Sequence, residues 1–250
     1  MAFEGANYAR DDGTGRTFRT THWSLVLRIG DQRPEEASKA LEELCRTYWY
    51  PLYAFARRKD YTHEQAQDLT QGFFAKLLER KQLSLASPGR GRFRTFLLHS
   101  FENFLRTEYR DANVQKRGGG RQLISWDEEE AAERYSSHVA DGASPAIVFE
   151  RQWAGVLLES VLGNLRREFS LSGKIELFEH LEPHLWGDDT STPYPQIAEA
   201  LNMTTVSVRV TVHRLRRRFH DLLREQIANT VKNLDEVEDE VRYLRRLWVN

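Results

Sequence analysis

The chain has 250 residues, enough for one or two domains that each bury a core of their own, at about 150 residues per domain. Its 36 basic and 37 acidic side chains nearly cancel, so the net charge of -1 does not by itself indicate a nucleic-acid-binding protein. Cys45 is the single cysteine, which excludes an intramolecular disulfide and any metal site built on several cysteines.

The sequence predicts neither a signal peptide nor a membrane span. Its first twenty residues are polar and dotted with glycine, and no run approaches the roughly 20 apolar residues that a membrane-crossing helix needs. We therefore expect a cytoplasmic protein. Residues 1–18 lack periodicity and are expected to form a disordered tail.

The pattern becomes helical from Thr20 onward, because apolar residues return at three- and four-residue steps. One helix is expected to start near Thr21, and a second places Pro34 in its first turn, where proline is tolerated. A third opens with Thr62 and Gln65, which have the spacing of a capping box.

The fourth predicted helix follows a turn-rich segment at 87–91 and directs an aromatic face inward. The residues of that face are Phe93, Phe96, Leu97, Phe101, Phe104 and Leu105. Three arginines of the same helix, Arg94, Arg106 and Arg110, are expected to lie outside. The four helices predict a compact bundle over residues 19–117.

A second helical domain is expected over residues 144–228. It begins at Ser144 and Pro145, a helix N-cap followed by proline at the first helical position. The glycine run at 118–120 and the acidic stretch after it make 118–143 a flexible linker. The chain is therefore predicted to be all-α, with two helical domains joined by that linker.

The segment 194–209 predicts a helix-turn-helix. Ile197, Ala198 and Leu201 form the apolar face of a short first helix. Asn202 tolerates the left-handed conformation that ends this helix, and Thr204 is able to cap the next one.

The second helix of this hairpin has a core face and a polar face. Its core face consists of Val208, Val212, Leu215, Phe219 and Leu222. The opposite face is expected to present hydroxyl and guanidinium groups from Ser207, Arg209, Thr211, Arg214 and Arg218. Such groups read base edges and phosphates from the major groove. A solvated basic helix is the alternative, which the turn and the cap make less favourable than DNA binding.

The hairpin resembles region four, the promoter-reading domain of extracytoplasmic-function sigma factors, through 194–202, Val208-Arg209 and 213–216. The N-terminal bundle is similar to region two of that family. There, Asp68-Leu69-x-Gln71-x-x-Phe74 resembles the helix that binds the polymerase clamp, and Phe93-Arg94-x-Phe96-Leu97 resembles the promoter-melting helix.

This resemblance implies a non-enzymatic protein without cofactor or metal, which binds core RNA polymerase and promoter DNA. It implies polymerase contacts from Asp68, Leu69, Gln71 and Phe74. It implies DNA contacts from His99, Asn103, Arg106, Arg110, Lys116, Arg117, Thr205, Ser207, Arg209, Thr211, Arg214 and Arg218. For Asn103, an ordinary exposed helix residue is an equal alternative.

The extension at 229–250 lies outside the family's minimum. Its helical stripe consists of Leu234, Val237, Val241, Leu244 and Trp248. We expect this stripe to pack against the second domain, with autoinhibition or partner docking as the alternative.

Two other functions are alternatives to the sigma-factor interpretation. A helix-turn-helix repressor or activator that acts without polymerase would explain the second domain but leave the first unassigned. A zinc hydrolase built on His180 and His184 is disfavoured because Pro183 would disrupt the helix that aligns them.

Control by an anti-sigma protein or by a Ser/Thr kinase is expected for such a factor. The start of the clamp-binding helix has fewer acids than relatives commonly carry, so we hypothesise that phosphorylation of Thr62, or secondarily Thr70, supplies the negative charge. Thr62 acting as an N-cap alone is the alternative. If a Thr62→Glu variant binds core polymerase no better than Thr62→Ala, the hypothesis fails.

Overall fold

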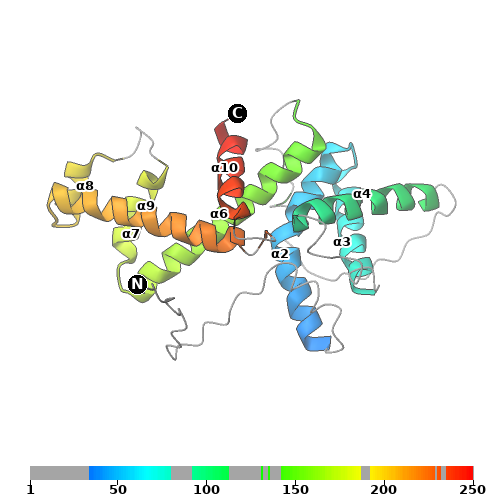
Figure 1. Cartoon of the computed structure of the whole chain (residues 1–250), viewed down its shortest axis with the longest axis horizontal. Coiled ribbons are helices and arrows are strands. Elements are labelled where there is room, and N and C mark those ends of the chain that lie inside the picture. Colours follow the sequence, from blue (N-terminus) through cyan, green and yellow to red (C-terminus); the bar gives the residue numbers. More distant parts are fainter. Residues whose placement is uncertain are drawn as a thin grey trace, which may run out of the picture.

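The computed structural model describes residues 34–79, 92–112, 131, 135, 142–186, 192–228, 230–231 and 235–249. In chain order its elements are α2 (Pro34–Arg58), α3 (His63–Glu79), α4 (Phe93–Ala112), α6 (Pro145–Leu171), α7 (Ile175–Leu181), the 3-10 helix η3 (Glu182–Leu185), α8 (Tyr194–Ala200), α9 (Thr205–Ala228) and α10 (Glu236–Val249) (Figure 1). Within these residues there is no strand, which confirms the all-α prediction.

Several expectations concern residues outside the described part. These are the tail at 1–18, the helix near Thr21, most of the linker at 118–143, Lys116, Arg117, Leu234 and the side chains of Arg110 and Trp248. Among the helices that the structure describes, none combines the length and apolar character that crossing a bilayer requires.

Local capping signals fix where the helices begin. Pro34 opens α2 as expected, and α3 follows a complete capping box. In that box the backbone N–H of Gln65 donates to Thr62 Oγ1 at 3.3 Å, and the backbone N–H of Thr62 donates to the side-chain Oε1 of Gln65 at 3.0 Å. Ser144 caps α6 by accepting the Ile147 N–H, with Pro145 at the first helical position. All three predicted helix starts are confirmed.

The core of the N-terminal bundle is aromatic. Phe93, Leu97 and Phe101 of α4 are fully buried, and Phe73 of α3 lies edge-on to Phe101 at a centroid distance of 5.1 Å. Tyr48 of α2 packs against Phe93 in the same way at 5.4 Å. Edge-to-face pairs of this kind are favourable beyond the area they bury.

Helix α6 connects the two predicted domains. In Figure 1 it runs diagonally, with α2 beside its first half and α7 at its far end. Phe149 and Trp153 are buried in the first half, and Val161 and Leu165 in the second. The core is therefore continuous from the N-terminal bundle to the helix-turn-helix. The flexible tether between two separately placed domains stays a prediction.

The described residues of the predicted linker contact α2. Ala143 accepts a hydrogen bond from Arg58 Nε at 2.7 Å, and the Tyr135 ring lies 5.0 Å from the Arg57 guanidinium. Ala131 is buried in the same core.

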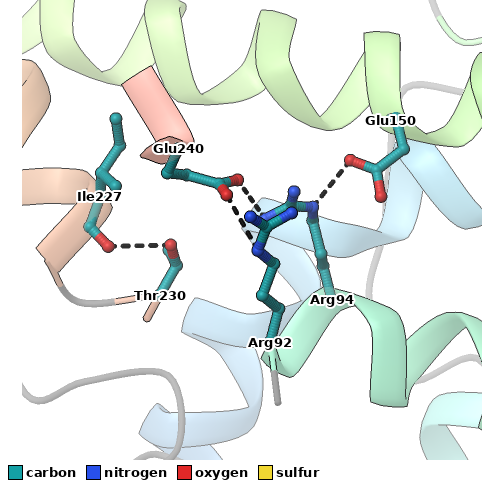
Figure 2. Close-up of polar contacts among 6 residues, drawn as sticks. All are labelled: Arg92, Arg94, Glu150, Ile227, Thr230 and Glu240. Carbon is teal, nitrogen blue, oxygen red and sulfur yellow. Dashed lines mark hydrogen bonds and ion pairs between the residues drawn. The ribbon is translucent and has the colours of Figure 1, made fainter. Parts of the chain in front are cut away.

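The expectation that Arg94 lies outside the bundle is wrong. Its side chain is 2% exposed and forms ion pairs with Glu150 of α6, at 2.7 Å, and with Glu240 of α10. Arg92 reaches the other oxygen of Glu240 at 3.0 Å (Figure 2). The helical pattern placed Arg94 on the outer side of α4, but α6 and α10 cover that side.

Aromatic rings complete the enclosure of Arg94. Its guanidinium carbon lies 4.3 Å from the centroid of Trp153 and 5.4 Å from that of Tyr243. Burial opposes the charge on Arg94, but Glu150 and Glu240 outweigh it and hold the pKa of Arg94 above its usual value. Burial likewise raises the pKa of Glu150, and Arg94 offsets part of that effect.

The C-terminal extension packs on the second domain, as the sequence predicts, and it also contacts α4. Helix α10 contacts α9 and α6, and Val237 and Leu244 are buried there. The turn before it contains Thr230, whose hydroxyl donates to the Ile227 carbonyl at 2.8 Å (Figure 2). Beyond the expected contact with the second domain, Glu240 extends the packing to α4.

We predict that Arg94→Ala lowers the free energy of unfolding by about 3–5 kcal/mol, because it leaves two buried carboxylates short of a cation. Arg46→Ala, which removes an exposed pair with Glu42 at 3.0 Å, should change it by about 0.5 kcal/mol or less. Urea unfolding followed by circular dichroism measures both. Equal small losses for the two variants would show that the Arg94 cluster does not stabilise the fold.

Candidate nucleic-acid interface

The turn between α8 and α9 has the geometry that a helix-turn-helix requires. Asn202 adopts φ 50°, the left-handed conformation expected of it. The Leu201 N–H donates to Ile197 O at 3.0 Å, and the Met203 N–H reaches back to Ala198 O at 2.8 Å. These bonds satisfy the last carbonyls of α8.

Helix α9 begins at a side-chain cap. Thr204 Oγ1 accepts the Ser207 N–H at 3.1 Å and lies 2.8 Å from Ser207 Oγ. The cap predicted from Thr204 is therefore confirmed, and it fixes the rotational phase of α9 from its first turn.

The core face of α9 follows the predicted spacing. Val208, Val212, Leu215 and Leu222 are buried, and Phe219 is half-buried against Trp186 at a centroid distance of 5.3 Å. Arg216 anchors the helix from its side by donating to the His184 carbonyl through Nε at 2.9 Å and Nη2 at 2.7 Å.

The outward face of α9 follows from this phase. At about 100° per residue, Val206, Val210, His213 and Arg217 point directly away from the buried stripe. All four are exposed, and so are Arg209 and Arg214 on either side of them. Within the part of the chain that the structure describes, neither Arg209 nor Arg214 forms an ion pair. Their guanidinium groups are available to a polyanion.

The remaining predicted DNA-contacting residues of α9 lie toward the edge of this face. Ser207 is bonded to Thr204, and Thr211 Oγ1 donates to Ser207 O at 2.7 Å. Thr205 is half-buried.

Arg218 is occupied by neighbouring carboxylates. It donates to both oxygens of Glu168, at 2.9 and 2.6 Å, and its Nη1 lies 3.6 Å from Glu225. The hydrogen bond to Glu168 is the main reason that the pKa of Arg218 is raised. This arginine secures α9 to α6, so its DNA-contacting role is the least supported of the set.

A second polar face lies on α4. His99, Asn103 and Arg106 are exposed and follow one another at steps of four and three, so they share one side of the helix. His99 Nδ1 lies 3.7 Å from Glu102, whose carboxylate also pairs with Lys59 at 3.7 Å. The structure therefore brings three of the predicted promoter-contacting residues together.

The predicted polymerase-binding residues of α3 divide into two groups. Asp68 is exposed, and Leu69 and Gln71 are half-buried. Phe74 is 2% exposed and packs against Phe73 at 5.7 Å. Phe74 therefore belongs to the core, and the expectation that its ring touches a partner does not fit the folded chain.

The two candidate phosphorylation sites have opposite surroundings. Thr62 is exposed, but its hydroxyl already caps α3 and donates to Glu64 Oε2 at 2.8 Å. The backbone N–H of Glu64, followed by this bond from Thr62, lowers the pKa of the Glu64 carboxyl. Thr70 is 0% exposed and donates to Ala66 O at 2.7 Å, so a kinase cannot reach it without opening the helix.

The structure offers no support for a zinc site at His180 and His184. Helix α7 ends at Leu181, before Pro183, so the two histidines lie on different elements. No group of three His, Cys, Asp or Glu residues is placed to hold a metal ion within the described ranges. His184 is buried, which lowers its pKa.

Sequence reasoning missed Val206, Val210, His213 and Arg217, the residues at the centre of the outward face. The signal was present, because each lies half a turn from the predicted core stripe. The predicted face favours polar side chains by residue type, and its mean direction lies about a quarter of a turn from the outward face.

Comparison with known proteins identifies no relative of this chain. No protein-family model, curated protein sequence or solved structure matches the chain. The interpretation of the two faces therefore rests on their own residues and geometry.

Proposed function

We propose that the chain is a transcription initiation factor of the extracytoplasmic-function sigma type. It binds core RNA polymerase and directs promoter recognition and opening. The observation that carries the proposal is the α8–turn–α9 hairpin, whose capped second helix exposes Arg209 and Arg214 free of ion pairs within the described chain. A helix of this kind enters the major groove with its N-terminal turns against the base edges.

The α4 face supplies the second contact in this proposal. His99, Asn103 and Arg106 offer ring, amide and guanidinium groups side by side, which suits bases and phosphates of a strand that is leaving the duplex. The aromatic residues of α4 are mostly buried, so the polar groups take this role. No hydrolysis is needed, because polymerase binding energy drives strand opening.

Core polymerase docks on α3 through Asp68, Leu69 and Gln71, which are at least partly accessible. Phe74 acts indirectly, as a buried residue that holds α3 in the core. Residues 19–117 correspond to region two and 144–228 to region four, with 118–143 as the tether that lets each take its place on polymerase and promoter. The factor works in the cytoplasm.

Run-off transcription tests the proposal. Purified chain mixed with core polymerase should yield transcripts from a subset of a promoter library, whereas core polymerase alone should not. In gel filtration the chain should run as a monomer and co-elute with core polymerase. A stable dimer that binds a palindromic site and ignores polymerase would instead identify a helix-turn-helix repressor or activator.

We predict that Arg214→Ala and Arg218→Ala separate DNA contact from helix packing. Arg214→Ala should weaken binding to a cognate duplex by about 1–3 kcal/mol and, where it contacts phosphate, reduce the salt slope of binding by about one. Arg218→Ala, which breaks the pairing with Glu168, should leave the salt slope unchanged and lower thermal stability instead. Fluorescence anisotropy over a salt series measures both, and the reverse ranking would refute the assigned face.

A further inference from the structure

Two exposed valines occupy the centre of the outward face of α9. Val206 is 69% exposed and Val210 is 44% exposed, although valine is usually buried in helices of this kind. They are four residues apart and therefore neighbours on one side of the helix. Their counterparts Val208 and Val212 on the opposite side are 0% and 2% exposed.

The surroundings of these valines identify their partner. Arg209, His213 and Arg214 are exposed around them, so the apolar centre has a cationic border. A protein partner would have to bury these charges, whereas duplex DNA supplies phosphates at the border and an apolar group inside the groove. That group is the 5-methyl of thymine, which projects into the major groove and is read by apolar side chains.

We propose that Val206 and Val210 read thymine methyl groups, and that the preferred duplex site carries thymines opposite the first two turns of α9. The inference rests on the proposed function and deepens it by naming what the recognition helix selects. Arg209 and Arg214 supply affinity and orientation, and the valines supply sequence preference. The caps at Asn202 and Thr204 hold the valines at the tip of the hairpin.

The test removes the methyl groups from the DNA. A site selected from a random duplex library with the full chain is resynthesised with uracil in place of single thymines, which deletes the methyl and keeps base pairing. Wild-type affinity should fall about fourfold at each thymine that a valine contacts, the equivalent of one buried methyl-sized group. Val206→Ala and Val210→Ala should each lose this sensitivity at one position.

Leu171→Ala is the matched control, since Leu171 is also an exposed apolar residue, 84% exposed, but ends α6. It should keep the full response to uracil. Equal affinity of the wild type for thymine and uracil sites overturns the valine assignment and leaves the proposed function standing. Failure of the wild type to select any duplex, both alone and in the presence of core polymerase, overturns both.

The Arg94 cluster independently supports a second inference, about control. Glu240 is 0% exposed and connects the C-terminal helix to Arg92 and Arg94 at the start of α4 (Figure 2). Helix α10 also packs on α6 and α9. One carboxylate therefore joins the helix that carries the second polar face to the elements that carry the helix-turn-helix.

We infer that α10 is a latch that holds the free chain closed and is released when the factor binds polymerase. Closing requires that Glu240 and Arg94 both leave water, so the cluster forms only when α4, α6 and α10 meet in one arrangement. With the latch closed, the α4 and α9 faces keep one fixed separation. Release of α10 removes one of the holds on this separation, and polymerase and promoter contacts then separate the rest of the packing along α6.

Arg92→Gln and Glu240→Gln test the latch. Arg92 is partly exposed, so Arg92→Gln removes one of the two cations at Glu240 with little risk to folding. Both variants should speed amide hydrogen exchange in 236–249 and tighten binding to core polymerase several-fold. Asp239→Asn, which alters an exposed ion pair with Arg242 within α10, is the control and should not tighten binding.

Unchanged or weaker polymerase binding by both variants would show that α10 is a structural brace and not a latch. The same conclusion follows if amide hydrogen exchange in 236–249 is as slow in both variants as in the wild type. If wild type and variants all fail to bind polymerase, the sigma-factor proposal itself is wrong.

Discussion

The arrangement of the described helices depends on one buried cation. Arg94 sits at the start of α4 and is enclosed by carboxylates from α6 and α10 and by the rings of Trp153 and Tyr243. Removing a guanidinium from water is costly, and the cost is offset only when its partners are held in place. Each of the three helices therefore constrains the other two, and the position of α4 relative to α9 follows from that constraint.

The same reasoning explains how α9 presents its outward face. Its phase is set by a cap at Thr204, by a buried valine and leucine stripe, and by lateral anchors from Arg216 to His184 O and from Arg218 to Glu168. Three arginines of α9 thus have different roles. Arg216 and Arg218 fix the helix, and Arg214 remains exposed for a ligand. Charge alone does not distinguish them, but their partners do.

Features that depend on near neighbours could be predicted from the sequence. The caps at Thr62, Ser144 and Thr204 and the left-handed Asn202 each involve atoms a few residues apart. The burial of Arg94 could not be predicted in this way, because its partners Glu150 and Glu240 come from distant segments. Helical spacing alone does not distinguish a position that another helix covers from one that faces solvent.

The continuous core has a consequence for the proposed function, in which the chain contacts two DNA segments. Helix α6 packs on α2 with one half and on α9 with the other, so apolar burial and the Arg94 cluster both favour one closed arrangement. An open arrangement would expose Trp153 beside Arg94, and the factor would have to recover that loss from polymerase and promoter contacts. In the proposed function, polymerase is the ligand that shifts this equilibrium, which couples the separation of the two polar faces to the presence of the enzyme.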